Sequence, residues 1–313
     1  MTDLRQTTDR VLMVRPAAFG FNAQTAATNR LQRTGPLTAP QAAALAREEF
    51  DRMVRALQSE GIRVCVAEDT PEPPKPDAVF PNNWVSFHGD GTLVLYPLCS
   101  ANRRPERRDA VISAVLRHFG ATIRRTLDLT HHEQQGRYLE GTGSLVLDHR
   151  ERIAYACRSA RTDAGLVEQW SRELGYEPLV FDAVDPAGNA YYHTNVMLSI
   201  GSASVILSSA AIAAADRARV LGRLAASARE IIDLAPSAIA DFAGNLLELA
   251  SWDEALGDCR VLVMSARARE ALDGPTFARL AACVDNVLAI PVPTIERLGG
   301  GGVRCMLAEV FLP

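Results

Sequence analysis

Short apolar runs rich in β-branched residues recur along the 313-residue chain, and polar residues separate them. Several runs contain an interruption that is typical of a tight turn: HGDG at 88–91, DHRE at 148–151 and IGSA at 200–203. Because each interruption has apolar residues on both sides, the pattern predicts pairs of short strands joined as β-hairpins.

Longer stretches with apolar residues at helical spacing lie between these strand pairs. The first runs from Thr38 to Gly61, where the glycine is a typical stop signal. The predicted order of elements is strand, strand, helix, strand, and it repeats along the chain, so we expect an α/β fold. The other predicted helices are 106–120, 161–175 and 209–225.

A second regularity is the spacing of polar residues at the predicted strand ends. Six of them lie 61, 57, 53, 52 and 60 positions apart, and five modules of that size fit the chain. The alternative is that these anchors fit the spacing by chance, but each also stands beside turn residues. We therefore predict a closed ring of five similar modules, whose strand ends converge on one central pocket. The anchors are Asn22, Asn83, Glu140, His193, Asn245 and Cys305.

The composition is that of an ordinary globular protein, with 48% hydrophobic residues, 22% charged residues and a net charge of −4. Such a chain lacks the basic surplus of a nucleic-acid-binding protein. No apolar run reaches the roughly 18 to 20 residues of a membrane span. The polar N-terminal stretch also lacks the apolar region of a signal peptide. We therefore expect a cytoplasmic protein with neither nucleic acid nor a membrane as its partner.

Cysteine and histidine spacing does not favour a metal site. The six cysteines include no CxxC pair, and HHE at 131–133 has no further histidine one helical turn away. We interpret five of the cysteines as reduced, buried thiols. Cys305 differs from them because four glycines, 299–302, precede it and Arg304 adjoins it.

Three residues have the chemistry of a nucleophilic site. The glycines would let a ligand approach the backbone at Cys305, and Arg304 would favour its thiolate, although a buried structural cysteine after a flexible loop is the alternative. His193 starts an apolar strand and, paired with a thiolate, would be the general acid and base; alone it would be a core histidine. Glu140 precedes Gly-Thr-Gly, where it would hold a cation, orient the histidine, or simply be a solvated turn acid.

Two asparagines stand in comparable places, Asn83 in FPNNW and Asn195 in HTNV. Asparagine is a common turn residue. It is also an uncharged group that both donates and accepts hydrogen bonds. Each residue is therefore a candidate either for a turn or for binding a polar ligand.

FPNNW, LEG, HTN and GGGVRC, in this order and spacing, resemble the guanidino-group-modifying superfamily, also called the amidinotransferase or pentein superfamily. The likeness is strongest to its branch of citrulline-utilisation hydrolases and amidinotransferases, and it extends from MVRPAAFGFN to the end of the chain. It implies a five-bladed α/β propeller of ββαβ modules in a pseudo-fivefold ring, with residues 1–313 as a single catalytic domain. It also implies that no cofactor is needed.

The resemblance assigns roles residue by residue. Cys305 matches the family nucleophile, His193 the histidine of its HxD motif, and Glu140 the glutamate of its EGGD motif. Asn83 and Asn195 stand where relatives that act on guanidinium have aspartates. SANRRPERR and CRSART resemble the segments whose arginines hold the substrate carboxylate. The expected substrate-binding residues are Asn22, Asn83, Asn195, Arg104 and Arg161, with Arg103 as the alternative to Arg104.

The two asparagines change the expected substrate. A guanidinium carries a positive charge and favours facing carboxylates, whereas a neutral ureido group offers a carbonyl and N–H groups that an amide can satisfy. The leading hypothesis is therefore a cysteine-dependent hydrolase that converts citrulline to ornithine, ammonia and carbon dioxide. An arginine dihydrolase or deiminase and an amidinotransferase remain alternatives.

A non-catalytic binding protein, as in the ribosomal anti-association factor of this fold, is an alternative of a different class. That factor lacks the Cys/His pair, so the combination of Cys305, His193 and Glu140 favours an enzyme. The expected partner is a small amino-acid substrate, and a homo-oligomer is left open.

Overall fold

The computed structural model of the protein describes residues 5–253 and 257–313. Residues 1–4, which begin the polar N-terminal stretch, and residues 254–256 lie outside the described part of the predicted 1–313 domain. Within the described ranges no helix is both long and apolar enough to cross a membrane.

Five three-stranded sheets make up the described chain, and all five share one topology. In each sheet the middle strand pairs antiparallel with one neighbour and parallel with the other. This repeat confirms the predicted α/β fold of five modules. The sheets are β15 (Ala308–Glu309), β1 (Arg10–Arg15) and β2 (Arg63–Glu68); β3 (Val85–Phe87), β4 (Thr92–Leu95) and β5 (Arg125–Asp128); β6 (Val146–Asp148), β7 (Ile153–Cys157) and β8 (Glu177–Phe181); β9 (Leu198–Ile200), β10 (Ser204–Leu207) and β11 (Glu230–Asp233); and β12 (Leu247–Asp253), β13 (Gly257–Ser265) and β14 (Asn286–Ile290).

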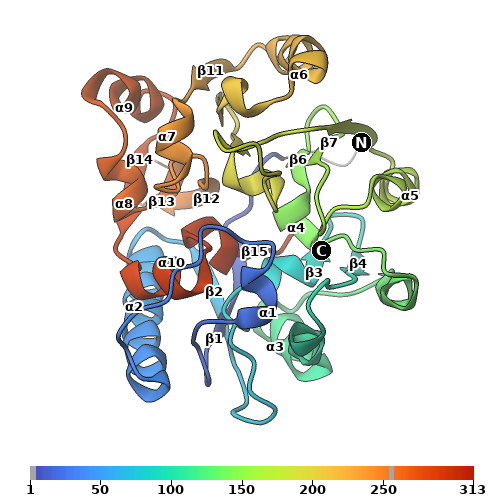
Figure 1. Ribbon diagram of the computed structural model, residues 1–313, viewed down its shortest axis with the longest axis vertical. Helices are drawn as coiled ribbons and strands as arrows, with labels where there is room; N and C mark the ends of the chain where they lie inside the picture. The colour runs from blue at the N-terminus through green and yellow to red at the C-terminus, as the bar shows by residue number, and fades with distance from the viewer. Residues whose placement is uncertain (1–4, 254–256) are drawn as a thin grey trace.

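One crossover helix joins the two parallel strands of each module, as a parallel pair requires. Figure 1 shows these helices around the periphery in chain order. The four helices predicted from the sequence are all present within a few residues of their expected bounds. Two of them end at Gly120 and Gly175, which adopt the left-handed conformation that favours glycine. The crossover helices are α2 (Ala39–Ser59), α3 (Asp109–Phe119), α5 (Ala164–Leu174), α6 (Ala214–Ala225) and α9 (Gly274–Ala281).

Short helices occupy the connections. The α-helical ones are α1 (Ala23–Ala26), α4 (Gly141–Ser144), α7 (Pro236–Ile239), α8 (Ala266–Glu270) and α10 (Pro293–Gly299). The 3₁₀ turns are η1 (Pro81–Asn83), η2 (Ala101–Glu106), η3 (Thr130–Gln135), η4 (Thr194–Val196), η5 (Ser209–Ala211) and η6 (Val303–Met306).

The first and last strands close the ring. β15, near the C-terminus, pairs with β1, near the N-terminus, so that Val11 faces Glu309 and Leu12 faces Ala308. An isolated bridge between Phe87 and Val310 then ties this sheet to the next module. The closure brings the C-terminal segment beside modules that precede it by more than 200 residues.

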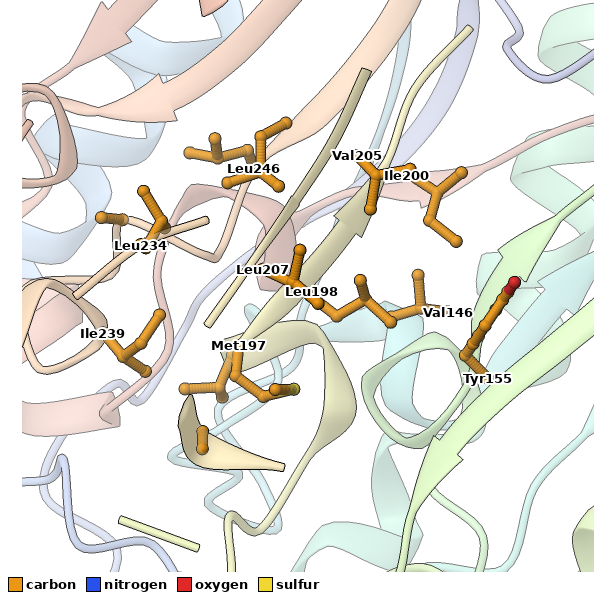
Figure 2. Close-up of a cluster of buried hydrophobic side chains, with 14 of the residues drawn as sticks. Val146, Tyr155, Met197, Leu198, Ile200, Val205, Leu207, Leu234, Ile239 and Leu246 are labelled. Atoms are coloured by element: carbon orange, nitrogen blue, oxygen red, sulfur yellow. The ribbon is translucent and has the colours of Figure 1, made fainter. Parts of the chain in front are cut away.

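Apolar side chains fill the spaces between neighbouring blades. In the largest cluster, side chains of the β6–β7 and β9–β10 hairpins contact side chains of the segments that follow β11 (Figure 2). These contacts hold successive modules together. Burying each such side chain contributes about 1.5–3 kcal/mol before entropy is counted. The labelled members are Val146, Tyr155, Met197, Leu198, Ile200, Val205, Leu207, Leu234, Ile239 and Leu246.

The first strand of every module begins with a turn at the same end of the ring. η1, α4, η4 and η6 precede β3, β6, β9 and β15, and the turn at 242–245 precedes β12. In each turn, one residue lies two or three positions before the start of the strand. These five residues are equivalent to one another in the repeat. They are Asn83, Gly143, Asn195, Asn245 and Cys305.

Helix α10 leads into the glycine segment and carries a buried acid. Glu49 on α2 accepts hydrogen bonds from the backbone N–H groups of Thr294 and Ile295, which fixes the start of α10. Burial raises the pKa of Glu296 on α10 to about 7, although a hydrogen bond with Ser265 opposes this shift. Ionisation of the buried Glu296 carboxyl therefore lowers the stability of the folded state.

We predict that Glu296→Gln stabilises the protein at pH 8 and leaves its stability nearly unchanged at pH 5. The folded state holds the Glu296 proton up to a pKa of about 7, against 4.5 for the ordinary group. The stability linked to that proton is complete below pH 4.5 and is lost as the pH rises through 7. Thermal melting at both pH values checks this, with about 2–4 °C expected per kcal/mol in a large domain. Glu72→Gln, at an exposed position, is the control; equal shifts at both pH values would contradict the interpretation.

Candidate active site

A narrow cavity lies where the module-starting turns converge. It is lined by four of the residues given an expected catalytic or substrate-binding role: Asn83, Arg161, His193 and Cys305. Two other hollows lie elsewhere, and none of the predicted site residues lines them. The remaining lining residues are Thr25, Asn29, Asp77, Phe80, Arg103, Tyr192 and the glycines at 299–301.

The glycine segment before Cys305 is fixed in place rather than a loose loop. Gly300 has a φ of 63° and therefore needs a residue that tolerates the left-handed conformation. Its carbonyl oxygen accepts hydrogen bonds from the Tyr192 hydroxyl at 2.6 Å and from Asn29 Nδ2 at 3.0 Å. A side chain at Gly301 would come within 3.2 Å of Cβ of Cys305. The glycines thus allow neighbouring elements to clamp the backbone that carries the thiol.

Cys305 is buried, with 4% of its surface exposed. Burial raises the pKa of its thiol, and a hydrogen bond from Asn245 opposes that shift most strongly. The Arg304 guanidinium donates to the carbonyl of Leu307 and to Glu309, so its fork does not hydrogen-bond to the sulfur. Amide groups therefore contact the sulfur directly, and Arg304 lowers the pKa of the thiol only through its charge.

His193 and Glu140 form a buried pair. The two side chains meet through His193 Nε2 and Glu140 Oε2 at 2.9 Å. Burial lowers the pKa of His193 to about 4 even though the carboxylate favours its charged form. Burial alone would raise the pKa of Glu140, but Arg161 and His193 together hold it well below its usual value. The pair is therefore a neutral imidazole that donates from Nε2 to a carboxylate, which leaves Nδ1 as the acceptor.

Glycines in EGTGS let the turn before β6 approach the turn before β3. A Cβ at Gly143 would lie 2.6 Å from His193 Nδ1 and 2.7 Å from Asn83 Nδ2. Gly141 has a φ of 48°, and a Cβ there would lie 2.1 Å from the carbonyl oxygen of Asn82. The absence of side chains at these positions allows the amide of Asn83 and the ring of His193 to come together.

Arg103 decides which way the Asn83 amide points. Arg103 Nη1 donates to Asn83 Oδ1 at 2.8 Å, and a guanidinium can only donate. The oxygen of Asn83 is therefore turned toward Arg103, and Nδ2 is turned toward Gly143 and Asn82 Oδ1. Arg103 is itself held by Glu106 at 2.9 and 3.0 Å. Asn83 consequently presents an N–H donor to the site.

In Asn195 the oxygen, rather than an N–H group, is the polar atom left without a partner from the backbone. Its Nδ2 donates to the carbonyl of Thr142 at 3.1 Å, which fixes the orientation of the amide. Its Oδ1 and Nδ2 lie 4.0 and 3.9 Å from Cys305 Sγ. With one N–H tied to the backbone, the free oxygen of Asn195 is an acceptor beside the sulfur.

Arg161 lies on the cavity wall but is tied to the N-terminal segment. Its Nη2 donates to the Thr25 carbonyl and its Nε to Thr28 Oγ1, both at 2.8 Å. Its Nη1 lies 3.3 Å from Glu140 Oε2. Arg161 thus links the His193–Glu140 pair to the N-terminal segment, whose Thr25 lines the cavity.

Asn22 is close to the site through a residue that the sequence analysis missed. Asn22 caps α1 and donates from Nδ2 to Asp77 Oδ2 at 2.7 Å. Asp77 is 2% exposed, and its Oδ1 has no hydrogen-bond partner among the described residues. Burial raises the pKa of Asp77, while Arg103 and Asn22 oppose that shift. The sequence signal for Asp77 was an acidic residue directly before the apolar residues 78–80, which lead into FPNNW.

Arg103, the alternative to the expected carboxylate-binding Arg104, is the arginine of this pair that lines the cavity. Arg103 is 1% exposed and lines the cavity, whereas the Arg104 side chain is 32% exposed and pairs with Glu133. Both lie in the 3₁₀ turn η2, where successive side chains diverge by about 120° because there are about three residues per turn. Only one of two adjacent arginines can therefore face the cavity.

We predict that Arg103→Lys lowers turnover at least tenfold while Arg104→Lys leaves it within about twofold. A lysine keeps the charge but cannot hold Glu106 with two donors and also fix Asn83, a loss of about 1–3 kcal/mol for a charge-assisted bond. Steady-state turnover and thermal melting of both variants check this. Equal activity of the two variants would show that the orientation of Asn83 does not matter.

The fold and the Cys–His–Glu arrangement define the class of pentein-fold, guanidino-group-modifying enzymes. The sequence model of the family described as "N,N dimethylarginine dimethylhydrolase, eukaryotic" matches residues 15–312, and the chain belongs to this family. Hydrolysis of a non-peptide C–N bond is the chemistry named by that family. No curated protein matches the sequence closely.

Solved structures share the fold at low sequence identity. The substrate-bound N-terminal domain of ArgZ, an arginine dihydrolase of cyanobacteria, is 17% identical, with a TM-score of 0.72 over 97% of this chain and 99% of that domain. Unliganded AgrE is 17% identical with a TM-score of 0.73 over 96% of this chain and 39% of its own. A dimethylarginine dimethylaminohydrolase adduct is 16% identical with a TM-score of 0.63, covering 97% and 99%.

Proposed function

We propose that the protein is a cysteine-dependent hydrolase of the ureido or guanidino C–N bond of an arginine-derived amino acid, with citrulline as the leading substrate. The products would be ornithine, ammonia and carbon dioxide. The observation that supports citrulline most directly is the fixed orientation of the two amides beside the thiol.

The ureido or guanidino head group of the substrate would bind beside Cys305, and we call this part the head of the site. It offers one amide donor and one amide acceptor. Asn83 offers Nδ2, because Arg103 occupies its oxygen. Asn195 offers Oδ1, because Thr142 occupies one of its N–H groups. A ureido group has a carbonyl that can accept from the first amide and N–H groups that can donate to the second. A guanidinium has only donors, so it would face the Asn83 N–H without forming a bond.

The carboxylates near the head are already occupied. Both oxygens of Glu140 have partners, Cys99 N for Oε1 and His193 for Oε2. Glu106 is held in a two-point contact by Arg103. A guanidinium bound next to Cys305 would therefore find no free oxygen on Glu140 or Glu106, which favours a neutral head group at that end of the cavity.

The amino-acid end of the substrate has complementary groups toward the N-terminal segment. Asp77 Oδ1 is a buried, unpartnered acceptor and suits an α-ammonium group. Arg161 is the guanidinium for the α-carboxylate, and Asn22 supports Asp77 from the same side. Since Arg161 also bonds Thr25 and Thr28, substrate entry requires these contacts to rearrange.

The proposed reaction has two steps. Cys305 Sγ attacks the ureido carbon, and His193 takes the thiol proton and passes it to the departing nitrogen as ammonia. A water activated by His193 Nδ1 then displaces the thiolate from the S-carbamoyl intermediate. The resulting N-carboxyornithine loses carbon dioxide, so that citrulline and one water give ornithine, ammonia and carbon dioxide. Glu140 keeps the imidazole oriented throughout.

Hydrolysis of arginine is the second candidate, because the same thiol and histidine would act twice on a guanidino group. The likeness to ArgZ makes this candidate concrete, although at 17% identity the likeness concerns the fold. Transfer of an amidino group to an amine in place of water would require a second amine substrate.

Purified enzyme incubated separately with citrulline, arginine and methylated arginines tests the proposal. Citrulline should give ornithine and ammonia in equal amounts, arginine alone should give neither, and Cys305→Ala should lose at least about a thousandfold in rate with the nucleophile removed. Two ammonia per ornithine from arginine would establish the second candidate. Full turnover by Cys305→Ala would overturn the mechanism.

A second prediction concerns selectivity. Asn83→Asp replaces the N–H donor with a carboxylate oxygen, so the ratio of kcat/KM for citrulline to that for arginine should fall at least tenfold, as expected for about 1–3 kcal/mol per mismatched buried group. Parallel assays of both substrates measure the ratio. Asn286→Asp at an exposed position is the control; an unchanged ratio in Asn83→Asp would remove this residue from substrate selection.

We propose further that the protein acts in the cytoplasm without a cofactor. Cys305 is a reduced thiol in the structure, and a reducing compartment would keep it active. The partner proposed is the small amino-acid substrate alone, and self-association stays open.

A further inference from the structure

Asn245, in the turn before β12, has no role in the mechanism described so far, yet it makes the shortest polar side-chain contact to the candidate nucleophile among the described residues. Its Nδ2 lies 3.4 Å from Cys305 Sγ. The corresponding contacts of Asn195 are 3.9 and 4.0 Å. Asn245 is 1% exposed, so no bulk water competes for this contact.

The orientation of the Asn245 amide follows from its other partner. Nδ2 also lies 2.9 Å from the backbone carbonyl oxygen of Asn195, which can only accept. If the amide were flipped, its oxygen would face that carbonyl, and two acceptors would meet. One N–H of Asn245 is therefore used by Asn195, and the second is directed at the sulfur.

The glycine segment is shaped to admit this amide. A Cβ at Gly302 would lie 2.7 Å from Asn245 Oδ1, so the amide packs directly against a residue without a side chain. On its other side, a Cβ at Gly244 would lie 2.6 Å from the carbonyl of Val196. The close approach of three segments thus holds Asn245 against Cys305.

Among the charged and titratable groups near the sulfur, Arg304 favours the thiolate through its charge, but the hydrogen bonds of these groups go to other partners. Arg304 donates its hydrogen bonds to Leu307 and Glu309. Tyr192 donates to Gly300, and His193 is paired with Glu140. Across the cavity lie Asp77, Arg103 and Arg161.

We propose that Asn245 is the hydrogen-bond donor that stabilises the Cys305 thiolate, and that it thereby makes the thiol a competent nucleophile. This inference rests on the proposed function in taking Cys305 as the attacking group. In the thiolate state the N–H of Asn245 points at the negative sulfur; in the thiol state the S–H can point at Oδ1, 3.7 Å away. A neutral amide can serve both states, which a fixed positive charge cannot.

The pH dependence of Cys305 alkylation tests this directly. Iodoacetamide reacts with thiolates, and peptide mass spectrometry separates Cys305 from the five other cysteines. In Asn245→Ala the midpoint should rise by about one pH unit, as expected for the loss of one hydrogen bond to the charged form. In Asn245→Asp, where a carboxylate replaces the donor, it should rise further. Asn286→Ala, at an exposed asparagine, should not move it.

Substitution of Asn245 should lower the catalytic rate constant rather than the affinity for substrate. For Asn245→Ala we expect kcat to fall about 10–100-fold, as for a lost donor to a developing charge, with KM within about threefold. Gly302→Ala keeps the Asn245 side chain but pushes its amide away, so it should move the alkylation midpoint in the same direction.

An unchanged alkylation midpoint in folded Asn245→Ala and Gly302→Ala, as judged by thermal melting, would overturn the inference. The alkylation profile requires no substrate, so it decides the role of Asn245 even if the wild-type protein turns over neither citrulline nor arginine. That second result would refute the proposed function alone.

Discussion

The pairing of β15 with β1 is the constraint on which the site depends. It is formed by two residue pairs between chain segments about 300 positions apart. Because β15 directly follows η6, this pairing sets where Cys305 stands relative to Asn83 and His193. Each module supplies only one turn to the axis, so no single module contains a site. The chemistry exists only when the ring is closed.

Once the ring is closed, the interior is organised so that charges are matched in pairs and amides face the sulfur. Arg103 is balanced by Glu106, and Arg161 by Glu140. A buried charge without a partner costs several kcal/mol, so these pairs leave little freedom to bind a further cation at the head of the cavity. The remaining polar groups there are neutral, and their orientation is set by backbone carbonyls and by arginine donors. The exception is Asp77, whose free oxygen lies on the side of the N-terminal segment.

Local sequence patterns were sufficient for the modules and for the main chemical groups. Turn residues between apolar runs, glycine stops and a period of 50 to 60 residues gave the helices, the hairpins and the number of modules. Cys305 was recognisable because unusual backbone freedom adjoined a reactive side chain. Asp77 was harder to recognise, because a single polar residue next to an apolar run is equally typical of a turn. Asn245 was recognised as an anchor, but its sequence surroundings did not indicate a chemical role. Arg103 and Arg104 are chemically identical neighbours, and only the direction of the side chain in η2 separates them.

The sequence by itself determined the α/β modules, their order, and the residue types that reach the axis, because periodicity and turn chemistry act over a few residues. Only the tertiary structure decided which polar atoms of those residues remain available for other partners. An asparagine can offer either its oxygen or its nitrogen, and at Asn83, Asn195 and Asn245 that choice is made by a partner from another segment. From the sequence, the glycine run at 299–302 indicated a flexible backbone. In the folded ring its carbonyls are clamped, because glycines admit neighbouring side chains that then hold the backbone.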